Sequence, residues 1–276
     1  MKKILYTFLL MLAGQSAFSQ YYYKDLVTTQ QANDQYALLQ KNGIKKVTLE
    51  SFDGNSSETA GFTGVQQVDL KKGTVTTTTS TTVIGDSYLK TTYNAKGLLS
   101  STEDSAQNAS SRGSYEYDAE GRLVKISSTN SSDNVNTTET HSWRYGADGK
   151  PTEMIRVRNN SDTTRVTFTL DENGNVVEEK VIRPNLPIAI VYYYYDAQNR
   201  MTDIVRFNAK ANRLLPDYMF EYDEAGRLKK MVVIPEGSNE YQTWYYQYTP
   251  NGLKRMELCY DKQQQLLGKV QYEYDM

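Results

Sequence analysis

Few side chains in this sequence are of the types that perform chemistry, and they do not cluster. His141 is the only histidine and Cys259 the only cysteine, so neither a zinc site nor a disulfide within the chain is available. A nucleophile–base pair would have to combine His141 or a carboxylate with a serine, a threonine or Cys259. We interpret His141 as a packed strand residue on the face of Tyr145, and Cys259 as a buried, inert thiol.

The acidic residues of the repeated turns do not have the spacing of a metal-binding loop. The run from Asp171 to Asn175 is the nearest match to a calcium loop, but it lacks the full spacing and the terminal glutamate. A pair of catalytic carboxylates, as in glycosidases, remains an open alternative, because any two of the 33 acidic residues can meet in space. We predict no enzyme activity, no metal and no cofactor, and we keep a secreted hydrolase with a carboxylate site as an alternative.

The composition limits the classes of partner that the protein can bind. The net charge is −2 over 276 residues, so no broad basic field attracts nucleic acid. Tyrosine dominates the aromatic residues, with 23 Tyr against 7 Phe and 2 Trp. A tyrosine has a large apolar ring and one hydroxyl, which suits half-wet sheet faces and binding surfaces.

The first residues read as a secretory signal peptide. Lys2 and Lys3 precede a short apolar run, and Ala17 and Ser19 occupy the small-residue positions before a cut at Gln20. The run is too short to span a bilayer, and no cysteine follows it to carry a lipid. We therefore expect residues 1–19 to be removed and the protein to be periplasmic or extracellular, without a lipid anchor or a membrane span.

One phrase recurs along most of the chain: an aromatic residue, often Asp, two residues, then Gly and often Arg. It reads Tyr117 to Leu123 in one strong copy and Tyr222 to Leu228 in another. The first residues of the copies lie at 93, 117, 145, 170, 195, 222 and 248, which are 24 to 28 residues apart. A period of this size indicates a repeat architecture.

The phrase has a conformational explanation. Asp or Asn opens a type I turn, and the fifth position then requires a positive φ, which Gly accepts freely and Asn tolerates. Such a turn closes an antiparallel hairpin with a bulge. The predicted structural turn residues are Gly97, Gly121, Gly149, Gly174, Asn199, Gly226 and Gly252.

The flanks of each phrase alternate as strands do. A large residue lies two positions before each phrase, hence on the same side of the sheet, and stacked repeats would form an aromatic ladder. After the turn, Leu123 and Ile126 are three apart, which indicates either a bulge or one residue on each face. The ladder is a candidate binding face for sugar rings or peptides, or else the core of the sheet itself. Its members are Tyr115, Tyr117, Trp143, Tyr145, Tyr193, Tyr195, Phe220, Tyr222, Tyr246 and Tyr248.

These phrases resemble the YD repeat of the Rhs family, whose unit reads roughly Tyr-Asp-x-x-Gly-Arg-Leu. The resemblance covers about residues 90–276 and is strongest at 115–126 and 220–231. It implies a long β-ribbon, which in large members closes into a shell around a toxin, and roles in adhesion or carbohydrate binding in others. This chain is far shorter than those members, so we expect no closed shell.

The fold we predict is all-β: antiparallel hairpin repeats with a period of about 26 residues, forming a twisted, curved meander sheet with a short N-terminal helix. Residues 24–42 supply the helix, which Gly43 ends, and residues 20–64 form an N-terminal helix and strand cap. Residues 65–276 form the YD-like repeat domain. We read the Ser/Thr/Asn-rich stretches 100–113 and 127–140 as long hairpin loops.

The function that follows is a non-catalytic exported protein that presents a β-sheet surface for cell-envelope, glycan or protein interaction. Its possible partners are a glycan or an envelope protein, and nucleic acid is excluded by the charge. A component of a polymorphic-toxin system of the Rhs type is the second alternative beside the hydrolase.

Overall fold

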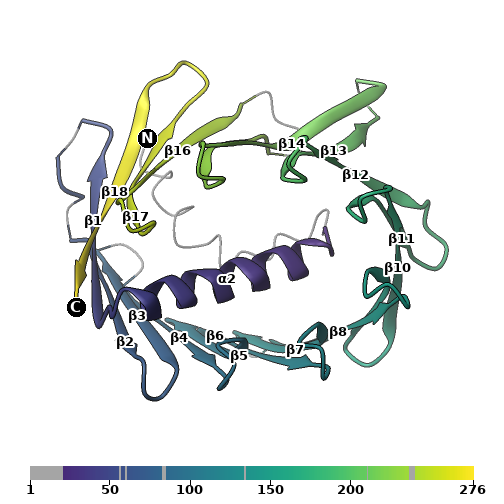
Figure 1. The fold of residues 1–276 in the computed structure, drawn as a ribbon, viewed down its shortest axis with the longest axis horizontal. Coiled ribbons are helices and arrows are strands. Elements are labelled where there is room, and N and C mark those ends of the chain that lie inside the picture. Colours follow the sequence, from purple (N-terminus) through teal and green to yellow (C-terminus); the bar gives the residue numbers. More distant parts are fainter. Residues whose placement is uncertain are drawn as a thin grey trace.

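The structure is a computed structural model, and it describes residues 21–276 except 56, 60, 83–84, 134, 210 and 236–239. The predicted signal peptide, residues 1–19, lies outside the described residues. The described chain is one helix and 18 strands, and the strands form a ring around the helix (Figure 1).

The helix is α2 (Lys24–Lys41). The strands of the first half are β1 (Lys46–Asp53), β2 (Thr63–Asp69), β3 (Thr74–Thr81), β4 (Gly85–Tyr93), β5 (Leu99–Ala106), β6 (Ala109–Tyr117), β7 (Leu123–Ser132), β8 (Val135–Tyr145) and β9 (Pro151–Arg158). Those of the second half are β10 (Asp162–Leu170), β11 (Val176–Ile182), β12 (Ala189–Tyr195), β13 (Met201–Asn208), β14 (Arg213–Tyr222), β15 (Leu228–Val233), β16 (Gln242–Tyr248), β17 (Lys254–Tyr260) and β18 (Leu266–Asp275).

The sheet is a closed antiparallel barrel, so the prediction of an open, curved meander was wrong. Every strand pairs with its neighbours in the chain, and β1 pairs with both β2 and β18, in the registers Val47↔Gln66 and Val47↔Tyr274. The last strand is therefore not an edge. Closure removes the unpaired backbone groups that both end strands of an open sheet would expose. The ribbon closes although we expected the chain to be too short for a closed shell.

The turn residues explain the hairpins at one rim of the barrel. Gly97, Gly121, Gly149, Gly174, Asn199, Gly226 and Gly252 all have φ between 60° and 86° and lie in the turns that join even-numbered strands to the next strand. The strand register shifts beside most of these turns, as between Glu116 and Tyr117. This bulge places both Leu123 and Ile126 opposite lumenal tyrosines, which explains their spacing of three. Bulges also increase local twist and so help to curve the sheet.

The Ser/Thr/Asn-rich stretches are strands, so the prediction of long loops was wrong. β5 and β6 pair up to Ala106↔Ala109, and β7 and β8 pair up to Ser132↔Val135, which leaves only two-residue turns. Threonine is β-branched and favours strands, and short hydroxyl side chains suit a sheet surface that faces water on one side. The polar composition therefore marked a solvent-facing wall.

The helix lies inside the ring and crosses the lumen (Figure 1). Tyr36 of α2 stacks on Tyr93 of β4 with ring centroids 3.9 Å apart, and Leu39 is buried in the same cluster with Val47 and Leu99. Much of the core thus lies between the lumenal face of the sheet and the segment Tyr21–Lys41, which we call the N-terminal segment. No helix within the described ranges is long and apolar enough to cross a membrane.

Candidate functional site

The aromatic ladder faces the lumen and forms much of the core. Trp143 packs with Tyr22 of the N-terminal segment, and Tyr193 packs with Tyr21 and is only 2% exposed. In five repeats the second aromatic residue is a tyrosine that ties its repeat to the preceding one, since its hydroxyl donates to a backbone carbonyl there. These bonds are Tyr117 to Leu99, Tyr145 to Leu123, Tyr195 to Val176, Tyr222 to Met201 and Tyr248 to Leu228, at 2.6 to 2.8 Å.

The remaining ladder residues lie on the same side. Tyr115 packs against the cluster around Tyr36, while Phe220 and Tyr246 pack against the cluster of Met231, Trp244 and Cys259. The ladder therefore does not form an uncovered outer face. Where the sequence allowed either a binding face or a core, the packing favours the core.

Charged turn residues extend the ladder at the rim. Arg200 pairs with Asp196 at 2.6 Å, and its guanidinium lies 4.8 Å from the ring centroid of Tyr222 in the next repeat. The Arg200 side chain lowers the pKa of Asp196 by hydrogen bonding. Arg122 and Arg227 repeat the arrangement over Tyr145 and Tyr248. The Arg of the phrase is thus a bridge between repeats.

A turn of the same kind lies at the opposite rim, where the periodicity did not reveal it. The backbone N–H of Gln264 donates to the carbonyl of Asp261, and Gln264 has φ +61°. The phrase Tyr260-Asp261 preceding it is half a period out of step with the other copies. Asp171, the nearest match to a calcium ligand, accepts from the backbone N–H groups of Asn173 and Asn175, as expected of a turn cap.

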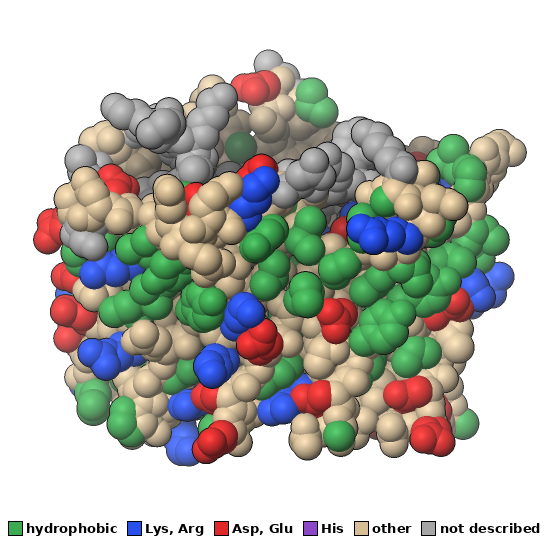
Figure 2. All heavy atoms as spheres, turned by 90° about the horizontal axis from the view of Figure 1, so that it is seen from above, with side chains coloured by type: hydrophobic (Ala, Val, Ile, Leu, Met, Phe, Trp, Pro, Cys, Tyr) green, Lys and Arg blue, Asp and Glu red, His purple; other side chains and the backbone are tan. Residues whose placement is uncertain are grey.

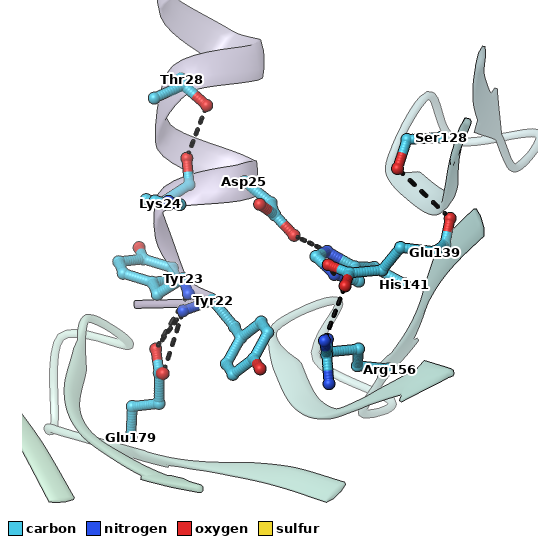
Figure 3. Close-up of polar contacts among 10 residues, drawn as sticks. All are labelled: Tyr22, Tyr23, Lys24, Asp25, Thr28, Ser128, Glu139, His141, Arg156 and Glu179. Atoms are coloured by element: carbon cyan, nitrogen blue, oxygen red, sulfur yellow. Dashed lines mark hydrogen bonds and ion pairs between the residues drawn. The ribbon is translucent and has the colours of Figure 1, made fainter. Parts of the chain in front are cut away.

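Glu179 of β11 holds the start of the N-terminal segment. Its carboxylate accepts the backbone N–H groups of Tyr22 and Tyr23 at 2.9 Å (Figure 3). It also accepts the hydroxyl of Tyr193 at 2.7 Å. The side chain is fully buried. Burial raises the pKa of Glu179 to about 7, although the three donors oppose the rise.

His141 of β8 forms a second anchor. Its Nδ1 lies 2.5 Å from Asp25 of α2 and its Nε2 lies 2.8 Å from Glu139, while Glu139 pairs with Arg156 at 2.7 Å (Figure 3). Burial lowers the pKa of His141, but the two carboxylates outweigh this and raise it to about 9. His141 is a packed strand residue on the ladder side, and in addition it is an ion-pair partner of a residue 116 positions away.

A third anchor involves Asp217 of β14. Its carboxylate accepts the Tyr21 hydroxyl and a hydrogen bond from Nε of Arg206, and the second guanidinium nitrogen donates at 3.0 Å. No pattern in the sequence predicts these partners, because Asp217 lies at an irregularity in the β13–β14 pairing. Together the three anchors fix Tyr21, Tyr22, Tyr23 and Asp25 to three different strands, β14, β11 and β8.

Glu179, His141 and Asp217 all bond to the N-terminal segment. Burial raises the pKa of the Cys259 thiol to about 12, so the thiolate nucleophile is suppressed at neutral pH. Among the described residues, no three His, Cys, Asp or Glu side chains are placed to hold a metal ion. Glu179, the carboxyl with the clearest raised pKa, has no surface that a substrate can reach.

The outer wall is asymmetric. On β4 to β7 the outward side chains are largely Ser, Thr, Lys and Glu, as in the cross-strand pairs Ser105↔Ser110 and Glu116↔Lys125. Over β12 to β18, hydrophobic side chains gather in a band next to a rim of alternating acidic and basic groups (Figure 2). Six exposed residues of β12 to β14 and the loop before β12 define what we call the apolar wall. They are Leu186, Ile188, Tyr194, Phe207, Leu214 and Met219.

A shallow groove of about 290 Å³ continues the apolar wall across β14 to β16. Met219 belongs to both the wall and the groove. The other lining residues are Lys230, Val232, Ile234, Tyr241, Thr243, Tyr245 and Gln264. None of the wall or groove residues belongs to the ladder, so sequence reasoning missed this surface. The only sequence signal for it was the apolar residues at the strand positions of β12 and β14 that alternate with the ladder.

Comparison with known proteins yields no family. No family model and no curated protein matches the chain. Among solved structures, the chain is similar to the Photorhabdus luminescens Tc holotoxin pore at 14% identity and a TM-score of 0.35, covering 78% of this chain and 12% of that one. It is also similar to a porin-like protein from Bacteroides uniformis at 10% identity and a TM-score of 0.45, covering 84% and 96% of the two chains.

Proposed function

We propose that this chain is a non-catalytic, exported binding protein of the cell envelope, and that it binds a protein partner through the apolar wall. The observation that carries the proposal is the concentration of exposed apolar side chains. Of nine large hydrophobic residues exposed in the described ranges, six belong to this wall. Contiguous exposed apolar surface on a folded protein marks an interaction site more often than a single exposed residue does.

The lumen is a weaker candidate for binding. Its aromatic rings already contact the N-terminal segment, as Tyr23 does Tyr193 at 5.3 Å between centroids. A glycan would have to displace that segment and break the bonds from Tyr22 and Tyr23 to Glu179. The hydrolase alternative meets the same obstacle, since the buried acids of the lumen are held by these anchors.

Site-specific photo-crosslinking in cells tests the proposal. A benzoylphenylalanine replaces Phe207, which is 58% exposed on the apolar wall. In a separate variant it replaces Tyr88, which is 41% exposed on the outer side of β4 to β7, called the polar wall below. Both positions already carry an exposed aromatic ring, so the two variants differ mainly in which wall carries the probe. We expect a discrete protein adduct from position 207 and none from position 88.

Two results would overturn the proposal. Absence of an adduct from position 207, and from a second probe at Met219, would show that the wall meets no protein. Equal adducts from positions 207 and 88 would show contact without preference for the apolar wall.

A further inference from the structure

A row of basic side chains crosses the lumenal face of β8 to β11. His141 is the cross-strand partner of Arg156, and Arg156 is the partner of Thr164. Arg183 directly follows β11, one residue beyond the last paired position of that strand, which places it beside Thr164. Because neighbouring strands lie only about 5 Å apart, the row brings two guanidinium groups to one patch of the lumen.

The acids beside this row pair with only two of its three basic groups. Two carboxylates flank His141, as described above, and Glu139 and Asp162 pair with Arg156 at 2.7 and 3.2 Å. Within the described part of the chain, Arg183 takes part in no ion pair. Arg183 is therefore a half-buried positive charge that no carboxylate balances directly.

Several buried N–H groups around Tyr22 lack an acceptor. They are Nε of Arg156, Nε of Arg183 and Nε1 of Trp143, and Trp143 packs in the same cluster as Tyr22. The Arg183 guanidinium also donates to the Tyr22 hydroxyl. Burial raises the pKa of this hydroxyl and the charges of Arg156 and Arg183 oppose the rise, so both guanidinium groups lie near it. Since a buried donor without an acceptor is unfavourable, a group that offers only acceptors would complete the patch.

We infer that this patch binds the oxyanion group of a small ligand, a phosphate or a carboxylate, and that Arg183 is the residue that holds it. A guanidinium presents its donors in a planar fork that matches two oxygens of such a group. The ligand enters from the rim, because Arg183 leads directly into the exposed residues 184–188. The N-terminal segment stays in place, since its Tyr22 forms part of the site. The site is separate from the apolar wall and does not depend on the function proposed for that wall.

Isothermal titration calorimetry of the purified protein tests the inference, with sodium phosphate and sodium acetate as separate probes at constant ionic strength. We expect saturable binding of at least one anion, and the anion that binds identifies the group as a phosphate or a carboxylate. Arg183→Gln removes the guanidinium and should weaken this binding roughly 10-fold or more. Arg112→Gln, at an exposed arginine of the polar wall, is the matched control and should leave the affinity unchanged.

Three results would overturn the inference. Without saturable binding of either anion, water alone meets the buried donors. An unchanged affinity in Arg183→Gln would show that the anion binds elsewhere, and an equal loss in Arg112→Gln would show that it responds only to the overall charge. A circular dichroism spectrum verifies that each variant is folded. Arg183→Met keeps the apolar stem of the side chain, so it should lose binding to the same extent and decides the test if Arg183→Gln does not fold.

Discussion

The imidazole Nδ1 of His141 lies 2.5 Å from the carboxylate of Asp25, so the first turn of the lumenal helix is tied to the barrel wall by an ion pair (Figure 3). Glu139 flanks the other ring nitrogen at 2.8 Å. The histidine is therefore held in its charged form between two acids, inside a part of the protein that is otherwise mainly apolar. Its titration should be visible as a change in the stability of the whole fold.

We expect the free energy of unfolding to fall as the pH rises from 7.5 to 9.5. The pKa of His141 is raised from 6.5 to about 9 in the folded state, so its contribution is complete below pH 6.5 and is lost as the pH passes 9. The full contribution is about 3 kcal/mol. Urea unfolding at several pH values measures the slope, and His141→Gln should remove it. A variant that keeps the slope between pH 7.5 and 9.5 would show that His141 is not the titrating group.

Glu179 should produce a second slope at lower pH. Its folded pKa is raised from 4.5 to about 7, so its contribution is present below pH 4.5 and is lost as the pH rises through 7. The loss amounts to about 3 kcal/mol at its largest. The free energy of unfolding of the wild type, measured with urea, should be lower at pH 7.5 than at pH 5. Glu179→Gln should reduce this difference.

The neighbouring acid is the control for that experiment. Glu178 points to the outer wall and pairs with Lys180 at 2.8 Å. Glu178→Gln should keep the slope of the wild type between pH 5 and 7.5. If both substitutions change the slope alike, the buried position of Glu179 is not its cause.

The parts of this structure that are local in sequence could be predicted. The turn phrase contains both the Asp that caps the turn and the residue with positive φ, and alternation then places Tyr115 and Tyr117 on one face. Closure could not be predicted in the same way. It depends on the pairing of β1 with β18, for example Leu49↔Tyr272. Nothing in the sequence of either strand identifies the other as its partner.

The anchors of the N-terminal segment were also beyond sequence reasoning. Asp25, Glu179 and Asp217 are far apart in the chain, and each is an ordinary acid in its own strand or helix. They become exceptional only when the barrel closes and brings them to the same segment. The sequence predicts a short helix that caps the first strand, and it contains no signal for the polar contacts that hold this segment inside the ring.

The conformational role of the turn glycines can be isolated at Gly226. Its φ is +78°, and a Cβ atom added there would meet no atom within 4 Å. Gly226→Ala should therefore lower the free energy of unfolding by about 1 to 2 kcal/mol through backbone strain alone. Asn199→Gly, at the equivalent turn with φ +60°, should change it by a few tenths or raise it. Equal effects of the two substitutions in thermal unfolding would contradict the requirement for a left-handed residue.

Tyr193 and Tyr194 test whether the ladder is core or binding surface, since they are adjacent in β12 and point to opposite sides. Tyr193 is 2% exposed and donates to Glu179, whereas Tyr194 is 47% exposed on the apolar wall.

Because deletion of a buried aromatic side chain leaves a cavity, Tyr193→Ala should cost about 3 to 5 kcal/mol. Tyr194→Ala should cost less than about 1 kcal/mol, since its ring already contacts water. Chemical denaturation of the two variants at the same low protein concentration compares their free energies of unfolding. If Tyr193→Ala left the stability unchanged, the lumenal ladder would be free to act as a ligand surface, and the assignment of the partner site to the outer wall would fail.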